Sequence, residues 1–349
     1  MVKQSVLGLM LVISISVSLP AQTKTMKIAG VDRTYIVHAP SGLNNPPLVL
    51  NIHGYNMDGP TEQSYTQMDK VADREKFIVV YPSAINKSWD MSGTNDFTFL
   101  LAIIDTIDKQ YKIDRNRIYS CGFSQGGFMT FQLACRYSEV FAAIAPTSGN
   151  LSGNCTLKRP MSMRLTFGTN EGFSGGTAAF MQNVTKWIDL CNCPKTPVVT
   201  SPYPSTNRNS LVTRLYYGPC DGGTEVIADS IRTGGHEWPM NTNDRINNSE
   251  ETWAFLKKFS LKDGVSVQHP QTIVSGGNNV SITYNSGVIH FQGVNEHSLV
   301  QIVDTKGRIV ESSKLNQSQI TLKNTVQGMY LLRINNKNMQ PVTMKMVIN

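Results

Sequence analysis

Ser124 is the residue of this sequence best placed to do covalent chemistry. It stands between two glycines in Gly122-Phe123-Ser124-Gln125-Gly126, after the apolar run RIYSCGF and before the helical pattern GGFMTFQLACRY. This arrangement is typical of a tight strand-to-helix elbow, in which flanking glycines remove side chains that would clash. Such an elbow lifts the hydroxyl above the sheet edge, beside the positive end of a helix. The pattern therefore predicts a nucleophilic serine.

A serine hydroxyl is a weak nucleophile unless a base takes its proton. Of the six histidines, His236 fits that role best, because it lies in the glycine-rich segment TGGHEWP after the last strand-like run of the first region. The same segment does not form a zinc-binding His-Glu-x-x-His pair, because Met240 stands where the second histidine is needed. We predict that His236 is the base, and we expect neither a metal nor a cofactor.

The base needs a carboxylate to orient it, and this carboxylate is expected between the serine and the histidine in the chain. Glu171 directly follows the strand-like run MRLTFGT and is the first candidate. Asp221, in GPCDGG, and Asp229, within the next strand-like run, remain alternatives.

The oxyanion of an acyl-transfer intermediate needs two backbone N–H donors. Gln125, the residue after the nucleophile, should provide one, and Tyr55, in the loop after His53, should provide the other. We also expect Trp89 and Trp238 to line a pocket for an aromatic acyl group, together with Tyr55. Ordinary packing is the alternative for these aromatic residues.

Strand-like and helical patterns alternate over residues 22–261. PPLVLNIHG and FIVVYP read as continuous apolar strands, and DFTFLLAIIDTIDKQY has the apolar spacing of a helix. This alternation predicts an α/β domain with a mostly parallel sheet covered by helices on both faces. Residues 262–284 are rich in Gly, Asn, Ser and Gln, which is typical of a linker. Residues 285–349 contain short alternating strands without helices, which predicts a small all-β domain.

The first 21 residues read as a secretory signal peptide, with an uncleaved anchor helix as the alternative. Lys3 gives a positive start, residues 6–17 are apolar, and Pro20-Ala21 offers a cleavage point. No other segment is long and apolar enough to span a bilayer.

Export leads to an oxidising compartment, where cysteines form disulfides. A zinc site is the weaker alternative, because Cys191-Asn-Cys193 lacks the Cys-x-x-Cys spacing. The even set of cysteines comprises Cys121, Cys135, Cys155, Cys191, Cys193 and Cys220.

Composition excludes some partners and leaves others open. Hydrophobic residues make up 40% of the 349-residue chain and charged residues 16%, so it has the material for a packed core. The net charge is +7, but the lysines and arginines are scattered, which argues against a nucleic-acid partner. A mildly basic surface favours the binding of acidic polysaccharide only weakly.

Taken in order, several of these pieces resemble one family, the secreted serine esterases that include feruloyl (cinnamoyl) esterases and polyhydroxybutyrate depolymerases. The resemblance covers residues 26–259. It rests on LVLNIHGYNMDG, FIVVYPSA, IDRNRIYSCGFSQGGFMTFQLAC, FAAIAPTSG, FGTNE and GGHEWP. It implies the α/β-hydrolase fold, with Ser124 as nucleophile and His236 as base.

The chain departs from the family pattern at two places. The family usually has a histidine that opens HGT and an aspartate two residues past the threonine, where this chain has Phe167 and Glu171. It also has two cysteines more than the family's four. The disulfides that the resemblance implies are Cys135–Cys155 and Cys193–Cys220, which leaves Cys121 and Cys191 as an expected third bridge.

The C-terminal region resembles the β-sandwich sorting domain of type IX secretion, through VQIVDTKGRIV, QGMYLLRI and MKMVI. The alternative is a carbohydrate-binding module, which should present aromatic side chains to sugars. Phe291 and Tyr330 are the only aromatic residues beyond position 285. A sorting domain implies that the secretion machinery is a partner and that the protein is extracellular, either released or attached to the cell surface.

These patterns together predict a secreted serine carboxylic-ester hydrolase that works through an acyl-serine intermediate. The expected substrate is a feruloyl ester of plant cell-wall xylan. A polyhydroxybutyrate depolymerase or an acetylxylan esterase would use the same machinery, because pocket shape decides between them. The non-enzymatic alternative is a surface-binding protein on a hydrolase scaffold. The expected partners are therefore a polysaccharide ester or polyester and the secretion machinery, with no nucleic acid and no membrane span after signal cleavage.

Overall fold

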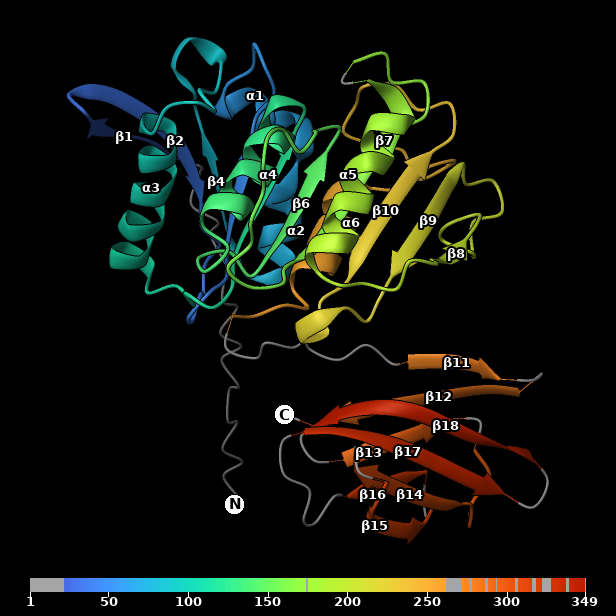
Figure 1. The fold of residues 1–349 in the computed structure, drawn as a ribbon. Helices are drawn as coiled ribbons and strands as arrows, with labels where there is room; N and C mark the ends of the chain where they lie inside the picture. The colour runs from blue at the N-terminus through green and yellow to red at the C-terminus, as the bar shows by residue number, and fades with distance from the viewer. Residues whose placement is uncertain are drawn as a thin grey trace, which may run out of the picture. The chain divides into compact units, whose positions relative to one another are not determined.

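A computed structural model gives the fold of the chain (Figure 1). It describes residues 22–173, 175–261, 271–275, 278–285, 288–292, 294–304, 307–315, 318–321, 328–336 and 339–348. The predicted signal peptide lies outside the described residues. The chain divides into two compact units, Met1–Asp221 with Glu225–Lys257, and Gly222–Thr224 with Lys258–Asn349.

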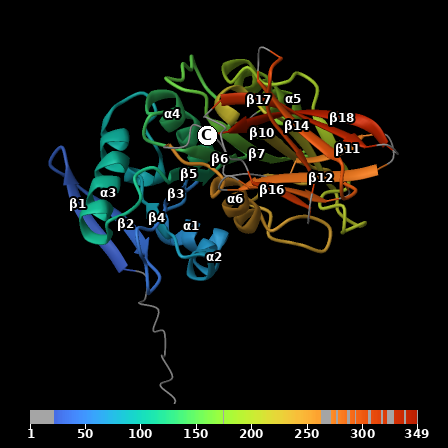
Figure 2. The same cartoon turned by 90° about the horizontal axis from the view of Figure 1, so that it is seen from below.

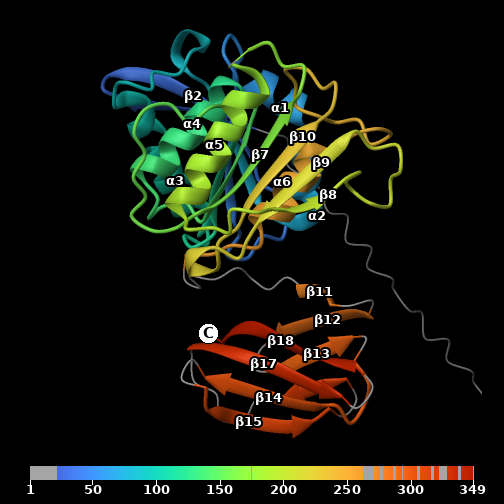
Figure 3. The ribbon, with the colours of Figure 1, turned by 45° about the vertical axis from the view of Figure 1, so that its right-hand side comes forward.

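A ten-stranded sheet is the frame of the first unit, in the order β1-β2-β4-β3-β5-β6-β7-β10-β9-β8. The six strands from β4 to β10 in this order are parallel, and each strand outside them pairs antiparallel with its neighbours. Figure 3 shows β7, β10, β9 and β8 side by side at one end. The strands are β1 (Gln22–Ile28), β2 (Val31–His38), β3 (Leu48–Ile52), β4 (Ile78–Pro82), β5 (Ile118–Phe123), β6 (Ala143–Thr147), β7 (Ser162–Gly168), β8 (Val198–Thr200), β9 (Val212–Tyr217) and β10 (Val226–Ile231).

The central strands are apolar because both faces of the sheet are covered. Every residue of β3 (LVLNI), β4 (IVVYP) and β5 (IYSCGF) is buried. Continuous apolar strands of this kind are typical of parallel sheets between two helix layers. The predicted α/β-hydrolase architecture is confirmed.

Two sets of helices cover the sheet. Figure 2 shows α3, α4 and α5 on one face and α1, α2 and α6 on the other. The helices are α1 (Gly59–Thr66), α2 (Met68–Glu75), α3 (Asn95–Tyr111), α4 (Gln125–Arg136), α5 (Gly176–Leu190) and α6 (Asn248–Leu256), with short 3-10 turns η1 (Ile85–Lys87) and η2 (Asp221–Gly223).

The carboxyl ends of the parallel strands meet at one edge of the sheet. Ser124 follows the last residue of β5, Glu171 comes three residues after the end of β7, and His236 comes five residues after the end of β10. Since β5, β7 and β10 run in the same direction, all three loops leave from this edge.

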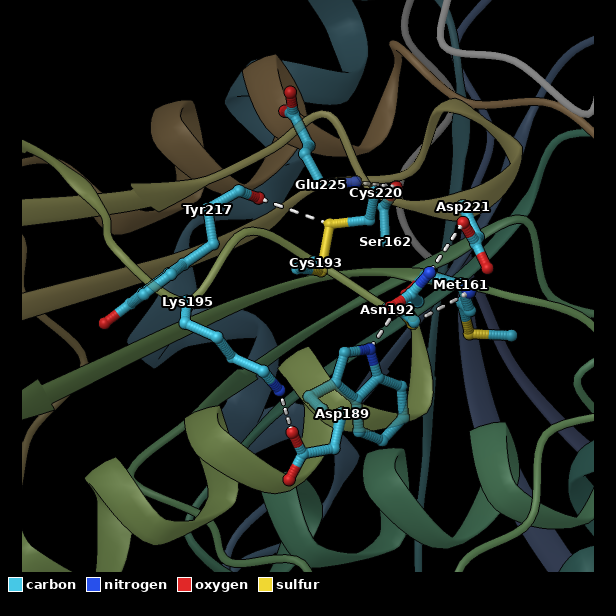
Figure 4. Close-up of a disulfide and its surroundings, with 12 residues drawn as sticks. Met161, Ser162, Asp189, Asn192, Cys193, Lys195, Tyr217, Cys220, Asp221 and Glu225 are labelled. Atoms are coloured by element: carbon cyan, nitrogen blue, oxygen red, sulfur yellow. Dashed lines mark hydrogen bonds and ion pairs between the residues drawn. A yellow bond between two sulfur atoms is a disulfide. The ribbon is translucent and has the colours of Figure 1, made fainter.

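Two disulfides tie surface segments of the first unit to each other. Cys135 in α4 is bonded to Cys155, and Cys193 is bonded to Cys220, which are the pairings that the resemblance implied. Figure 4 shows the second bridge beside Asn192 and Asp221. It closes a loop of 27 residues, which restricts the unfolded chain and so favours the native state.

The expected third bridge between Cys121 and Cys191 is wrong, because the two cysteines lie on opposite faces of the sheet. Cys121 shares its face of β5 with Tyr119, whose ring packs against Trp253 of α6. Cys191 follows α5 on the other face, where its Sγ donates to the carbonyl oxygen of Met161 at 3.3 Å. The resemblance indicated only that two cysteines were left over, and the strand alternation separates them.

The second unit is a sandwich of two four-stranded antiparallel sheets, β11-β12-β13-β16 and β15-β14-β17-β18. Its described core combines residues of both sheets, among them Phe291, Ile302 and Tyr330. The strands are β11 (Gln271–Ser275), β12 (Asn278–Asn285), β13 (Val288–Gln292), β14 (Leu299–Asp304), β15 (Ile309–Lys314), β16 (Gln319–Thr321), β17 (Gly328–Asn336) and β18 (Met339–Ile348).

The sandwich extends into the segment that was expected to be a linker. β11 and β12 lie within residues 262–284, apart from the last residue of β12, and β12 pairs with β13 along five residues. The many Gly, Asn and Ser residues of this segment hid the short alternating runs QTIVS and NNVSITYN. The remainder of the expected linker, residues 262–270, lies outside the described residues.

Candidate active site

Ser124 occupies the elbow between β5 and α4, with backbone angles φ 54° and ψ −119°. A positive φ is unfavourable for a residue with a side chain and is found mostly where the surroundings enforce it. Here the Ser124 N–H donates to the carbonyl of Thr147 at 2.9 Å, and the Phe128 N–H donates to the Ser124 carbonyl at 3.1 Å. The serine is thereby fixed at the start of the helix.

The flanking glycines are required because the elbow lies against the end of β3. A Cβ atom added to Gly126 would lie 1.8 Å from the carbonyl oxygen of Ile52, and one added to Gly122 would lie 2.6 Å from the same oxygen. Real Cβ atoms do not approach a backbone oxygen so closely. The Gly-x-Ser-x-Gly pattern is thus explained by contact between β3 and the elbow.

His236 and Glu171 form a direct pair. The Nδ1 atom of His236 lies 2.5 Å from Oε1 of Glu171, and the Glu171 side chain is fully buried whereas that of His236 is 20% exposed. An ionised carboxylate can only accept, so Nδ1 carries the proton and Nε2 is left as an acceptor. The imidazole is therefore in the tautomer that a general base requires.

The second carboxyl oxygen of Glu171 is held by a residue that sequence reasoning missed. The hydroxyl of Ser148 donates to Oε2 of Glu171 at 2.7 Å. Ser148 follows the end of β6 directly, at the same edge of the sheet. That position after a parallel strand is the signal that could have identified it.

His236 also lies next to the elbow. Its ring centroid is 4.7 Å from that of Phe123, the residue that precedes Ser124, and 5.0 Å from that of Phe173. The structure therefore brings the Glu171–His236 pair to the segment that carries Ser124.

The alternative acids have other partners and positions. Asp229 lies inside β10, where its carboxylate accepts from Arg164 and Arg214 at 2.7 and 2.6 Å. Burial alone would raise the pKa of Asp229, but the two guanidinium groups lower it. Asp221 precedes β10 and so lies at the opposite edge of the sheet, where Asn192 donates to it at 3.3 Å. The carboxylate that contacts His236 is that of Glu171.

The two residues expected to stabilise an oxyanion flank Ser124. Gln125 is the first residue of α4, so its backbone N–H has no acceptor within the helix. Tyr55 follows Gly54, and a Cβ atom added to Gly54 would lie 3.3 Å from the Cβ of Ser124. The backbone before Tyr55 therefore packs against Ser124.

The buried side chain of His53 holds the loop that contains Gly54 and Tyr55. It is fully buried, its Nδ1 donates to the carbonyl of Gly54 at 2.7 Å, and its Nε2 accepts from the N–H of Ala84 at 2.9 Å. Burial lowers the pKa of His53, which favours the neutral ring that this pair of bonds requires.

The expectation that Trp89 and Trp238 line a substrate pocket is not supported, because they are only 4% and 2% exposed. The indole N–H of Trp89 donates to the carbonyl of His53 at 2.9 Å, and that of Trp238 donates to the Ser249 hydroxyl at 3.0 Å. Both indoles support loops of the site from inside. Tyr55, in contrast, is 68% exposed.

Tyr65 is a further supporting residue that no spacing rule connects to the site. Its hydroxyl accepts from the backbone N–H of Trp238, two residues after His236, at 2.8 Å. Its ring packs edge-on against Phe123 with 5.5 Å between centroids. Burial raises the pKa of Tyr65, so the phenol stays neutral. Helix α1 thereby joins the histidine loop to the elbow.

The described residues contain no group of three or more His, Cys, Asp or Glu side chains that could hold a metal ion. No helix in the described part of the chain has both the length and the apolar character needed to cross a bilayer.

Comparison with known families agrees with the resemblance seen in the sequence. Residues 33–163 match the family model described as esterase PHB depolymerase. Residues 277–349 match the secretion system C-terminal sorting domain. Both predicted resemblances are confirmed, and the second match confirms a secreted localisation.

Individual relatives are esterases. The chain is 33% identical to a bifunctional acetylxylan esterase/xylanase of Neocallimastix patriciarum over 73% of this chain and 36% of the relative. It is 26% identical to feruloyl esterase B of Piromyces equi over 66% of this chain and 46% of the relative. The chain thus spans less than half the length of these two relatives. The solved acetyl xylan esterase from Aspergillus awamori has the same fold, with a TM-score of 0.54 and 16% identity over 68% of this chain and 98% of that one.

Proposed function

Because the chain carries a hydrolase domain that matches the esterase PHB depolymerase model, followed by a sorting domain, we propose that it is a secreted serine carboxylic-ester hydrolase. The observation that carries the proposal is the 2.5 Å contact between His236 and Glu171, packed against the residue before Ser124. A non-catalytic scaffold would have no need of a strained serine whose neighbour Phe123 packs against an oriented imidazole.

In the proposed reaction the Ser124 hydroxyl attacks the ester carbonyl while Nε2 of His236 takes its proton. The N–H groups of Gln125 and Tyr55 stabilise the oxyanion. The protonated imidazole, held by Glu171, then gives its proton to the leaving alcohol, and an acyl-serine remains. Water activated by the same histidine hydrolyses the acyl-serine and restores the enzyme.

The substrate that we propose is a feruloyl ester of plant xylan. Support comes from the relative named feruloyl esterase B and from the exposed aromatic rings of Tyr55 and Phe173. An acetylxylan ester is the second candidate, favoured by the name of the relative with 33% identity. Polyester hydrolysis is the third, from the description of the matching family.

A fluorophosphonate probe and a substrate panel test this proposal. We expect the full chain to be labelled at Ser124 and to hydrolyse methyl ferulate faster than acetylated xylan or a hydroxybutyrate polymer. The Ser124→Ala variant should lose labelling and activity while it keeps its thermal unfolding midpoint.

Glu171→Gln should lower kcat by on the order of 10²-fold or more, because the imidazolium loses its counter-charge. Asp221→Asn is the matched control and should leave kcat unchanged. A larger loss in Asp221→Asn would show that the acid is misassigned, and an unlabelled wild-type chain would refute the esterase function itself.

A further inference from the structure

Among the described residues of the first unit, two aromatic side chains are exposed, and both lie on loops of the candidate active site. Tyr55 is 68% exposed and Phe173 is 67% exposed. The other exposed large hydrophobic residues that the structure describes are aliphatic, namely Val31, Ile85, Val198, Val199, Ile309 and Val310. An apolar ring left in water beside a reactive group offers binding energy to a substrate that covers it.

The two rings come from loops on either side of the nucleophile. Tyr55 lies after β3, which pairs with one side of β5, and Phe173 lies after β7, which follows β6 on the other side of β5. Phe173 contacts the candidate base, with 5.0 Å between its ring and the imidazole of His236. Tyr55 instead lies in the loop expected to bind the oxyanion.

These positions correspond to different parts of an ester. The carbonyl oxygen faces the oxyanion donors, whereas the alcohol oxygen must lie against Nε2 of His236 to receive its proton. A group attached to the alcohol oxygen therefore lies next to His236, where the exposed ring of Phe173 contacts the imidazole. The C–H face of a sugar ring is apolar and packs on an aromatic ring.

We propose that Phe173 is a specificity-determining residue that binds the sugar ring of the leaving alcohol. The inference rests on the proposed esterase function and extends it, because it predicts selection of the alcohol rather than of the acid. Phe173 would contact substrate before and during acylation. After the alcohol has left, the ring has no sugar to bind, so deacylation should not depend on it.

The test compares two esters of one acid, the acid being the acyl group that the substrate panel selects. One is its methyl ester and the other a monosaccharide ester. In the full chain, Phe173→Ala should lower kcat/KM for the sugar ester at least roughly fivefold more than kcat/KM for the methyl ester, mainly through KM. Phe173→Tyr should keep kcat/KM for the sugar ester close to that of wild type, because tyrosine keeps the aromatic ring.

Val198→Ala is the matched control, since Val198 is 64% exposed on β8 and lies outside the site. The single-turnover rate of acyl-enzyme hydrolysis should be equal in wild type and Phe173→Ala. An equal loss on both esters, or a slower deacylation, would mean that Phe173 only positions His236 and would overturn the proposal.

An unchanged kcat/KM of Phe173→Ala for the sugar ester would overturn the proposal as well. Hydrolysis of the hydroxybutyrate polymer alone, which contains no sugar, would overturn the role of Phe173 and leave the esterase function intact. Hydrolysis of no ester by the wild-type chain would refute both.

Discussion

At the scale of single residues, Glu171 is held from two sides, by His236 at Oε1 and by Ser148 at Oε2. The resembling family usually has the shorter aspartate at this place in the sequence. A glutamate has one more rotatable bond, so a single orientation requires an additional contact. We infer that Ser148 is a positioning residue that makes the longer acid usable.

Glu62 is a buried acid outside the proposed reaction. It lies in α1 with no exposed surface, and neither of its carboxyl oxygens has a hydrogen-bond partner among the described residues. Thr66, one turn later, accepts from Asn51 at 2.9 Å, and the Oδ1 atom of Asn51 likewise has no partner there. Burial raises the pKa of Glu62 well above its usual value, so the native state holds its proton.

This burial makes stability depend on pH. Above the ordinary pKa of glutamate the unfolded chain releases the proton that the native Glu62 keeps, so stability falls as pH rises toward the raised pKa, by up to about 1.4 kcal/mol per pH unit. Glu62→Gln removes this titration. We expect its advantage over wild type in the free energy of unfolding, measured with urea, to be larger at pH 7.5 than at pH 4.

Glu139→Gln serves as the control, because Glu139 is an exposed acid paired with Lys158. The lysine and a backbone N–H lower the pKa of Glu139, which gives the opposite sign of pH dependence. An exposed pair of this kind contributes less than about 1 kcal/mol, so the control should change little at either pH. An advantage of Glu62→Gln that is the same at both pH values would contradict a raised pKa.

At the scale of elements, the elbow depends on contact between β3 and the start of α4. In Gly126→Ala the added methyl would enter the carbonyl of Ile52, at 1.8 Å. The strand and helix must then separate, which should cost about 3 kcal/mol or more, the upper end for overpacked cores. Thermal unfolding followed by circular dichroism should show a clearly lower midpoint.

Gly172→Ala is the comparison for that variant, because an added Cβ there meets nothing within 4 Å. Its unfolding midpoint should equal that of wild type. Equal midpoints for both alanine variants would mean that the elbow does not need its glycine.

The elements that carry the site were predictable because their signals are local. The buried strand before Ser124 and the helix after it appear in RIYSCGFSQGGFMTF. Glu171 and His236 lie in the short loops after apolar runs, three and five residues past the ends of their strands. Chain direction then places all three at one edge of a parallel sheet. No contact between distant side chains was needed for these expectations.

Other features depended on tertiary contacts that a sequence does not display. An indole can line a pocket, or it can be buried in the core while its N–H donates one hydrogen bond. Trp89 and Trp238 are buried and each donates one such bond. Whether Cys121 lies on the same face of the sheet as Cys191 depends on the register of β5, which the sequence does not display. The support from Tyr65 comes from a helix more than 170 residues before Trp238 in the chain.

At the scale of the whole molecule, the proposed chemistry belongs to one unit only. Ser124, Glu171 and His236 lie in the first unit, and the β-sandwich has a separate hydrophobic core. A chain that ends at residue 261 should therefore keep kcat/KM on a small soluble ester within about twofold of the full chain. A loss of more than tenfold in a folded truncated protein would show that the second unit takes part in the reaction.

The buried aromatic residues of the second unit argue against the carbohydrate-binding alternative, and its sequence matches the sorting domain. Phe291 and Tyr330 are 4% and 6% exposed, so neither is presented to a sugar. The sequence distinguished this domain from a binding module correctly, by the scarcity of aromatic residues. It failed at the domain boundary, because turn-forming residues are common both in linkers and between short strands.

The separate origins of the three functional loops have a consequence for how such a protein diversifies. The proposed nucleophile, acid and base follow three different strands, and the exposed rings of Tyr55 and Phe173 lie on the loops after β3 and β7. Insertions or exchanges in one loop leave the strand pairing of the others intact. Selection can therefore retune which alcohol or acid is accepted by changing one segment at a time, while the same sheet is inherited unaltered.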